Sequence, residues 1–166
     1  MSDVNKMVLY HGSAESFEAF QPAFVGTKHA DIIRDECEHE SLEPTAFYFS
    51  NDLETAIWYA KSSAEKLGKP AADGVVISVS LSMANPKKVN FRGEGREYLG
   101  EELASAKLNG NDGLICLNYD DGGVSDHYVV FDASMINILK TETVHEIERQ
   151  KHTESAPEQD TSCTPG

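Results

Sequence analysis

The sequence predicts an α+β domain in which a β-sheet core carries a few flanking helices. Segments that read as strands outnumber those that read as helices, and strands do not alternate regularly with helices. At 166 residues, of which 40% are hydrophobic, the chain is long enough to bury one core. After residue 140 the composition becomes rich in Glu, Thr, Ser, Gln and Pro. We therefore expect a domain over residues 1–140 and an acidic, disordered tail over residues 141–166.

Charge and composition restrict the partners. The formal net charge of −14 disfavours nucleic acid and anionic membranes and favours a basic protein or a small ligand in a local pocket. No apolar run approaches the roughly 20 residues that span a bilayer, and the first residues lack a signal pattern. The odd number of cysteines, Cys37, Cys116 and Cys163, suggests a reducing compartment without disulfides. A cytoplasmic protein is expected, although delivery into a host cell by another route stays open.

The first half of the chain contains two predicted strands and one strong helix. Residues 6–10 read as a strand that runs into His11, and the aromatic residues 45–50 read as another. Asn51 is the expected N-cap of the following helix, with Glu54 closing a capping box. Its apolar stripe runs to Leu67, and Gly68 ends it. The polar stretch over residues 27–43 is expected to be a lid or binding loop.

The second half predicts more strands than helices. A helix is expected over residues 96–108, where Asn109 and Gly110 end it. A β-branched run predicts a central strand over residues 74–81. Further strands are expected over residues 88–91, 114–117, 126–131 and 135–139, with a glycine-rich loop over 119–125 and only a transient helix over 144–151.

Several residues admit two interpretations from their positions alone. On a helical wheel Tyr59 lies about 120° from the centre of the apolar stripe. It could line a cleft beside Tyr48, or both tyrosines could be boundary residues with solvated hydroxyls. His11 beside Gly12 could cap a turn at the end of a strand. Cys37 and His39 lack a second pair of ligands, so no metal is expected.

Three segments together resemble the ADP-ribosyltransferase superfamily, in the branch shared by diphtheria toxin and the poly(ADP-ribose) polymerases. That branch carries a histidine on a first strand, a tyrosine on a second and a glutamate at the start of a later one. The matching segments are Leu9-Tyr10-His11-Gly12-Ser13, Ala46-Phe47-Tyr48-Phe49-Ser50 and Asp126-His127-Tyr128-Val129-Val130-Phe131-Asp132. The resemblance spans residues 9–139 and implies a split β-sheet.

The resemblance implies NAD as the substrate and assigns roles to residues of the first two segments. His11 would hydrogen-bond the adenosine ribose, and the backbone of Gly12 would hold the nicotinamide carboxamide. Tyr48 and Tyr59 would sandwich the cationic nicotinamide ring, whose charge an aromatic face attracts. Ser13 would be a secondary contact. Phe47 and Phe49 are expected to face the core because neighbouring residues of a strand alternate sides.

The third segment departs from the family pattern. His127 stands where the family usually has glutamate, and a neutral histidine supplies no negative charge to an oxocarbenium-like transition state. Asp126 would supply that charge, but strand alternation sends Asp126 and His127 to opposite faces. Both residues could also be ordinary surface residues of an edge strand. Members of the superfamily without the glutamate are limited to single transfers or are inactive, so chain elongation is not expected.

The sequence therefore predicts an NAD-dependent mono-ADP-ribosyltransferase. His11, Tyr48, His127 and Asp126 are its candidate catalytic residues, and a protein is the expected acceptor. Two alternatives stay open: an NAD glycohydrolase, in which water is the acceptor, and an inactive module of the same fold that binds NAD, ADP-ribose or a protein. Small standalone proteins of this kind resemble those of phages and bacterial effectors.

Overall fold

Seven strands form a mostly antiparallel sheet in the computed structural model, which describes residues 3–20, 46–94, 96–120 and 123–155. The strands follow the order β4-β5-β6-β2-β1-β3-β7, and only β4 and β5 are parallel. Three α-helices accompany the sheet in these residues, so the predicted α+β class is confirmed. The bounds are β1 (Leu9–Ser13), β2 (Phe47–Ser50), α2 (Leu53–Lys66), β3 (Val75–Leu81), β4 (Pro86–Asn90), α3 (Arg96–Leu108), β5 (Gly113–Asp120), β6 (Val124–Val130), β7 (Ile136–Thr143) and α4 (Val144–Ser155).

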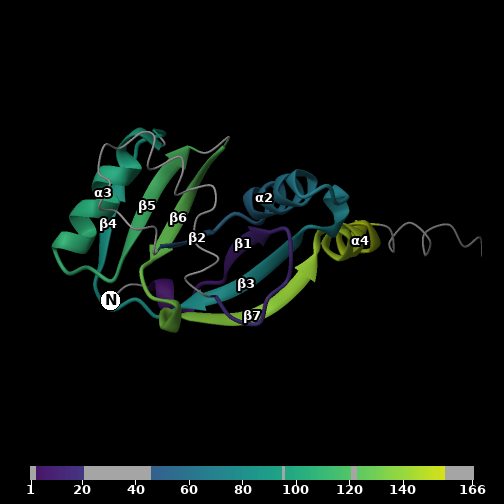
Figure 1. Ribbon diagram of the computed structural model, residues 1–166, viewed down its shortest axis with the longest axis horizontal. Coiled ribbons are helices and arrows are strands. Elements are labelled where there is room, and N and C mark those ends of the chain that lie inside the picture. The colour runs from purple at the N-terminus through teal and green to yellow at the C-terminus, as the bar shows by residue number, and fades with distance from the viewer. Residues whose placement is uncertain (1–2, 21–45, 95, 121–122, 156–166) are drawn as a thin grey trace, which may run out of the picture.

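The sheet is narrowly joined between β1 and β2. These strands pair only at Tyr10 and Ser50, whereas β1 pairs with β3 over its whole length and β2 pairs with β6 over its whole length. The sheet therefore consists of two parts, β4-β5-β6-β2 and β1-β3-β7, that meet at one residue pair. Figure 1 shows the two groups of strands running in clearly different directions.

All three helices pack on one face of the sheet, which we call the helix face. Helices α2 and α4 cover β1 and β3, where Ala56, Ala60 and Val76 form a buried cluster with Val144 and Ile147. Helix α3 covers β5 and β6 through a second cluster made of Leu99, Leu103, Leu114, Cys116 and Val129 with neighbouring side chains.

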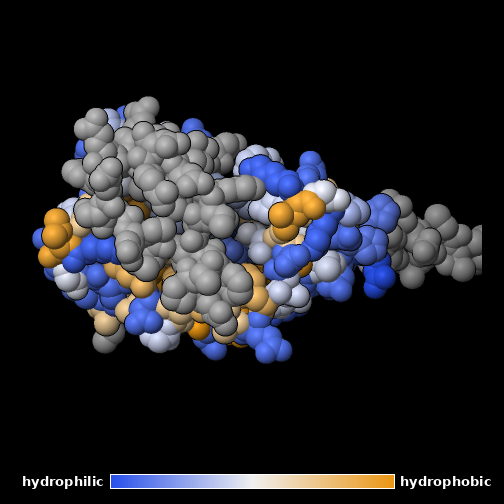
Figure 2. All heavy atoms as spheres, in the orientation of Figure 1, coloured by the Kyte–Doolittle hydropathy of each residue, from blue (hydrophilic) through white to orange (hydrophobic). Residues whose placement is uncertain are grey.

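The opposite face, which we call the phenylalanine face, holds the largest hydrophobic cluster. Phe47 and Phe49 are 6% and 1% exposed and contact Phe20, as the predicted strand alternation requires. Ile77, Val79 and Val130 complete the middle of this cluster. Figure 2 shows a molecular surface on which apolar residues are scattered among hydrophilic ones, with the α4 end mostly hydrophilic.

Helix α2 begins one residue later than the sequence predicted. Its N-cap is Asp52, whose carboxylate accepts hydrogen bonds from the backbone N–H and the hydroxyl of Thr55 at 3.1 and 2.6 Å. Asn51 instead bonds β6, since its N–H donates to the carbonyl of Asp126 and its Oδ1 accepts from the N–H of Asp126, both at 3.1 Å. The predicted capping box of Asn51 and Glu54 is therefore wrong, because Asn51 hydrogen-bonds Asp126 of β6 instead of capping the helix.

The prediction of a disordered tail from residue 141 is wrong for residues 141–155. Strand β7 continues to Thr143, and α4 follows it directly. A capping box starts the helix: the hydroxyl of Thr143 accepts from the N–H of Glu146, and the Glu146 carboxylate accepts from the N–H of Thr143, both at 3.1 Å. Val144 and Ile147 are 0% and 6% exposed. Residues 156–166 lie outside the described residues.

Replacing Ile147 by alanine tests whether α4 belongs to the domain. We expect Ile147→Ala to lower the free energy of unfolding by about 2–4 kcal/mol, because it removes most of a buried aliphatic side chain. Arg149→Ala, at an exposed position of the same helix, should change it by less than about 0.5 kcal/mol. Urea denaturation of the full chain measures both values, and equal stabilities of the two variants would show that α4 does not dock.

The remaining predicted elements need smaller changes. The strand expected at 88–91 is β4, which begins at Pro86. The loop expected at 119–125 is shorter, because β5 runs to Asp120 and β6 starts at Val124. The expected lid over residues 27–43 lies outside the described residues. No helix in the described part of the chain is long and apolar enough to cross a membrane.

Candidate functional site

His11 lies on β1 and points into the phenylalanine face. Its ring meets those of Phe20, Phe49 and Phe17, with centroids 5.2, 5.8 and 6.3 Å away. Its Nδ1 lies 2.9 Å from the backbone carbonyl of Tyr48, on the neighbouring strand β2. A carbonyl only accepts, so Nδ1 carries the proton and donates. The imidazole therefore bridges β1 and β2 beyond the point where these strands stop pairing.

The protonation state of His11 follows from its surroundings. Burial lowers the pKa of the imidazole below its ordinary value of 6.5, and the hydrogen bond to Tyr48 offsets this only in part. The ring is therefore neutral at neutral pH. Because Nδ1 holds the proton, Nε2 has a free lone pair and can accept a hydrogen bond from a ligand hydroxyl.

The lowered pKa of His11 makes folding sensitive to mild acid. Below pH 6.5 the unfolded chain protonates this histidine before the folded chain does, so stability falls as the pH drops. We expect His11 to contribute a slope of up to about 1.4 kcal/mol per pH unit between pH 6.5 and its folded pKa. Above pH 6.5 the histidine is neutral in both the folded and the unfolded chain, so the free energy of unfolding should no longer depend on His11. Denaturation at several pH values should show this slope in the parent but not in His11→Gln, and identical slopes would contradict it.

Gly12 and Tyr59 lie directly against one another. A Cβ added to Gly12 would stand 2.8 Å from the Cβ of Tyr59, 2.2 Å from the carbonyl oxygen of Ala56 and 2.6 Å from the nitrogen of Ala60. Helix α2 therefore rests on the backbone of β1, and only glycine fits between them. Tyr59 is half-buried and contacts Trp58, which is 58% exposed.

Tyr48 lies on the helix face, opposite to the ring of His11. Its side chain packs against the cluster under α3. Burial raises the pKa of its phenol, with smaller contributions from Cys116 and Tyr119, so the hydroxyl is neutral. Burial also raises the pKa of the Cys116 thiol to about 12, which excludes this cysteine as a nucleophile at neutral pH.

His127 shares the helix face with Tyr48. It is 7% exposed, lies opposite Ser50 of β2, and meets the ring of Tyr119 at 4.7 Å. Its Nε2 lies 3.0 Å from the Oγ of Ser125, which in turn lies 3.4 Å from the Oγ of Ser50. The site thus holds a chain of polar side chains where the family pattern has a single glutamate.

Asp126 points the other way, as strand alternation predicted. Its carboxylate accepts the N–H of Asn118 at 3.0 Å and, more weakly, the amide of Asn51 at 3.5 Å. These contacts fix the irregular pairing of β5 with β6 and the turn before α2. Its neighbour Tyr128 belongs to the cluster of the phenylalanine face. Asp126, and not His127, therefore lies on the side of the sheet that holds the His11 ring.

The structure brings the predicted residues together as strands but divides their side chains. His11, Tyr48 and His127 lie on the adjacent strands β1, β2 and β6. The ring of His11 lies on one face of the sheet, and those of Tyr48 and His127 lie on the other. Ser13 bonds locally to Glu15, donating to its carbonyl at 2.9 Å and accepting from its N–H at 3.3 Å.

The two hydroxyls linked to His127, those of Ser125 and Ser50, were not among the predicted site residues. Ser125 precedes His127 by two residues on the same strand, and such residues share a face. Ser50 follows Tyr48 by two residues for the same reason. Once His127 and Tyr48 are assigned to strands, the two-residue period of a strand predicts that Ser125 and Ser50 lie on the same face as they do. In the described ranges, no group of three or more His, Cys, Asp or Glu residues could hold a metal ion.

Comparisons with known proteins add no identification. No family model matches the chain, and no curated protein matches it.

Proposed function

We propose that the chain is an NAD-dependent mono-ADP-ribosyltransferase with an ADP-ribosyltransferase-like fold, acting on a macromolecular acceptor, most simply a protein. The observation that carries the proposal is the adjacency of β1, β2 and β6. The histidine, the tyrosine and the residue in the glutamate position come from distant parts of the sequence and fall on three neighbouring strands. In addition, Nδ1 of His11 bonds the backbone of Tyr48 directly.

NAD is proposed to bind where β1 and β2 diverge beside their single pair of Tyr10 and Ser50, a place that we call the opening between β1 and β2. Beyond Tyr10, β1 has no pairing partner on its β2 side among the described residues. The Nε2 of His11 would accept a hydroxyl of the adenosine ribose, and the nicotinamide would stack on the ring of Tyr59 beside Gly12, because α2 fills the space directly above Gly12.

The chemistry requires the glycosidic bond of NAD to break. Nicotinamide leaves with the bonding electrons, the acceptor atom bonds to C1 of the ribose, and the proton of the acceptor passes to solvent. Positive charge develops on the ribose in the transition state, which a carboxylate stabilises. Asp126, which precedes His127 in the sequence, is the carboxylate that would stabilise this charge. Its oxygens can accept further hydrogen bonds in addition to those from Asn118 and Asn51.

A second candidate function is NAD or ADP-ribose binding without turnover. Two observations favour it: His127 supplies no negative charge while it bonds Ser125, and the Asp126 carboxylate already accepts two hydrogen bonds. This candidate shares the binding opening with the first and differs only in its chemistry. Measuring the reaction products therefore distinguishes the transferase from the binding module, whereas measuring NAD binding does not.

A transfer assay with adenine-labelled NAD tests the proposal. The parent chain, Tyr59→Ala and Tyr98→Ala are each incubated with labelled NAD and cell lysate, and both labelled protein and free nicotinamide are measured. We expect the parent and Tyr98→Ala to label protein alike. Tyr59→Ala should lose at least about tenfold, because one face of the nicotinamide pocket is missing. Tyr98 is the matched control, since it is a tyrosine on another helix, α3, and is 46% exposed.

The products distinguish the alternatives. Free nicotinamide without labelled protein would identify a glycohydrolase. Binding of NAD with neither product would favour the module without turnover. Equal labelling by the parent and by Tyr59→Ala would contradict the proposed pocket.

A further inference from the structure

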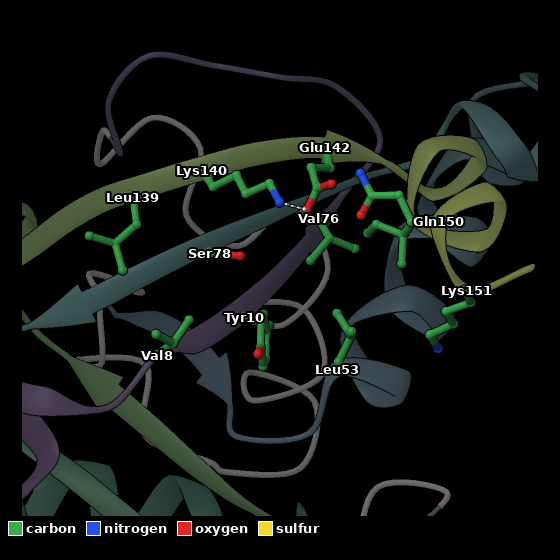
Figure 3. Close-up of a pocket in the computed structure, with 11 residues that line it drawn as sticks. Val8, Tyr10, Leu53, Val76, Ser78, Leu139, Lys140, Glu142, Gln150 and Lys151 are labelled. Atoms are coloured by element: carbon green, nitrogen blue, oxygen red, sulfur yellow. Dashed lines mark ion pairs between the residues drawn. The ribbon is translucent and has the colours of Figure 1, made fainter. Parts of the chain in front are cut away.

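An open pocket of about 530 Å³ lies on the helix face, between β1, β3, β7 and helix α4. Figure 3 shows Tyr10 and Ser78 on its floor, with Leu139 on one side of Tyr10 and Leu53 on the other. Its volume falls within the range of about 300–1,000 Å³ typical of small-molecule sites. None of the residues that we assign to NAD binding lines this pocket.

The apolar wall of the pocket is built from side chains that the domain leaves partly exposed. Ser78 and Val79 of β3 pair with Lys140 and Ile138 of β7, so Leu139 is the extra residue of a β-bulge. Leu139 is 50% exposed, and Val8, at the entrance of β1, is 46% exposed. Both line the pocket and offer apolar surface to a ligand.

The floor offers two hydroxyl groups that form no hydrogen bond with the described residues. Tyr10 and Ser78 are directly opposite one another on β1 and β3, so their side chains point to the same side of the sheet. Neither side chain hydrogen-bonds another residue in the described part of the chain. A hydroxyl both donates and accepts, so the pair can hold one hydroxyl or carbonyl group of a ligand.

The charges around the pocket are already neutralised. Lys140 pairs with Glu142, with Nζ and Oε1 3.0 Å apart, and Figure 3 shows this ion pair at the rim. Lys151 pairs with Glu54 of α2. No lysine or carboxylate of the lining is therefore left to neutralise a charged ligand, and the net charge of −14 repels anions further.

We propose that this pocket binds an uncharged small molecule with an apolar body and one hydroxyl or carbonyl group. The apolar body lies against Val8, Leu53 and Leu139, and the polar group reaches the hydroxyls of Tyr10 and Ser78. A charged group would lose its hydration without gaining an unpaired partner. The pocket shares no binding residue with the proposed NAD site, so this proposal does not depend on whether the chain binds NAD.

Three compounds with the same ring and different charge test this selectivity. 2-Naphthalenemethanol, 2-naphthoate and 2-naphthylmethylammonium are each titrated into the ¹⁵N-labelled full chain, and amide shifts are followed by NMR. We expect the alcohol to shift the amides of Tyr10, Ser78 and Leu139 saturably, with a Kd of a few millimolar or lower for a ligand of this size. The two charged compounds should bind at least about fivefold more weakly.

Variants then locate the bound group. Tyr10→Phe and Ser78→Ala, which remove one hydroxyl each, should weaken binding of the alcohol about threefold to tenfold. Leu139→Lys should weaken it at least as much, whereas Leu108→Lys, at an 87% exposed leucine of α3, should have no effect. The proposal is overturned if the three compounds bind equally, if no amide of the pocket shifts saturably, or if the two hydroxyl variants bind as tightly as the parent.

Discussion

Gly12→Ala should lower the free energy of unfolding by about 2–4 kcal/mol, one of the largest single-residue effects expected in this chain. The added methyl group would stand 2.2 Å from the carbonyl oxygen of Ala56 and 2.6 Å from the nitrogen of Ala60. Both atoms belong to the backbone of α2, so no side-chain rotation relieves the clash. The helix must move away from β1 and take Tyr59 with it.

Gly123→Ala is the matched control for this effect. Apart from its chain neighbours, no heavy atom of the described residues lies within 4 Å of a Cβ added to Gly123, and the φ of Gly123 lies outside the region that favours glycine. We expect its stability to match that of the parent within about 0.5 kcal/mol. Urea denaturation followed by circular dichroism measures both variants. A Gly12→Ala protein as stable as the control would show that α2 does not rest on β1.

His127→Glu should raise ADP-ribosyl transfer at least about tenfold, since it restores the negative charge that the family pattern has at this position. The hydroxyl of Ser125, which lies 3.0 Å from Nε2 of His127, can donate to the new carboxylate. The position is 7% exposed, so the carboxylate also pays a cost of burial and the folded protein should be less stable. Transfer of label from NAD, corrected for the folded fraction at the assay temperature, measures the gain.

His127→Gln separates charge from shape. Glutamine has nearly the size of glutamate and keeps a hydrogen bond to Ser125, but it carries no charge. Its transfer should therefore stay near the level of the parent. Equal activities of the glutamate and glutamine variants would mean that charge at this position does not limit the reaction. Activity in neither variant nor parent, with NAD bound by all three, would favour the module without turnover.

Local patterns were enough to find most elements of the fold. The β-branched run predicted the strand β3, and helical periodicity with Asn109 and Gly110 at its end predicted α3 at its observed bounds. The failures came from long-range contacts and from a missed cap. Asn51 was a sound N-cap on local grounds, but its bonds to Asp126 move the cap to Asp52. Helix α4 was expected only as a transient helix over residues 144–151, although Thr143 and Glu146 form a capping box that starts it.

The sequence allowed the candidate site residues to be assigned to strands, but it did not predict on which face of the sheet each side chain lies. The order of motifs placed His11, Tyr48 and His127 on strands, and alternation correctly separated Asp126 from His127. Which face each side chain takes depends on how β1 meets β2, and this pairing is a single contact between Tyr10 and Ser50. No local pattern encodes such a contact. The tight approach of α2 to Gly12 depends in the same way on packing across the sheet.

A crystal structure of the full chain with NAD tests the central claim most directly. If NAD occupies the opening between β1 and β2, the nicotinamide ring will stack on Tyr59 beside Gly12. A hydroxyl of the adenosine ribose will then lie within hydrogen-bond distance of Nε2 of His11. NAD bound elsewhere on the chain, with neither Tyr59 nor His11 in contact, would contradict the account.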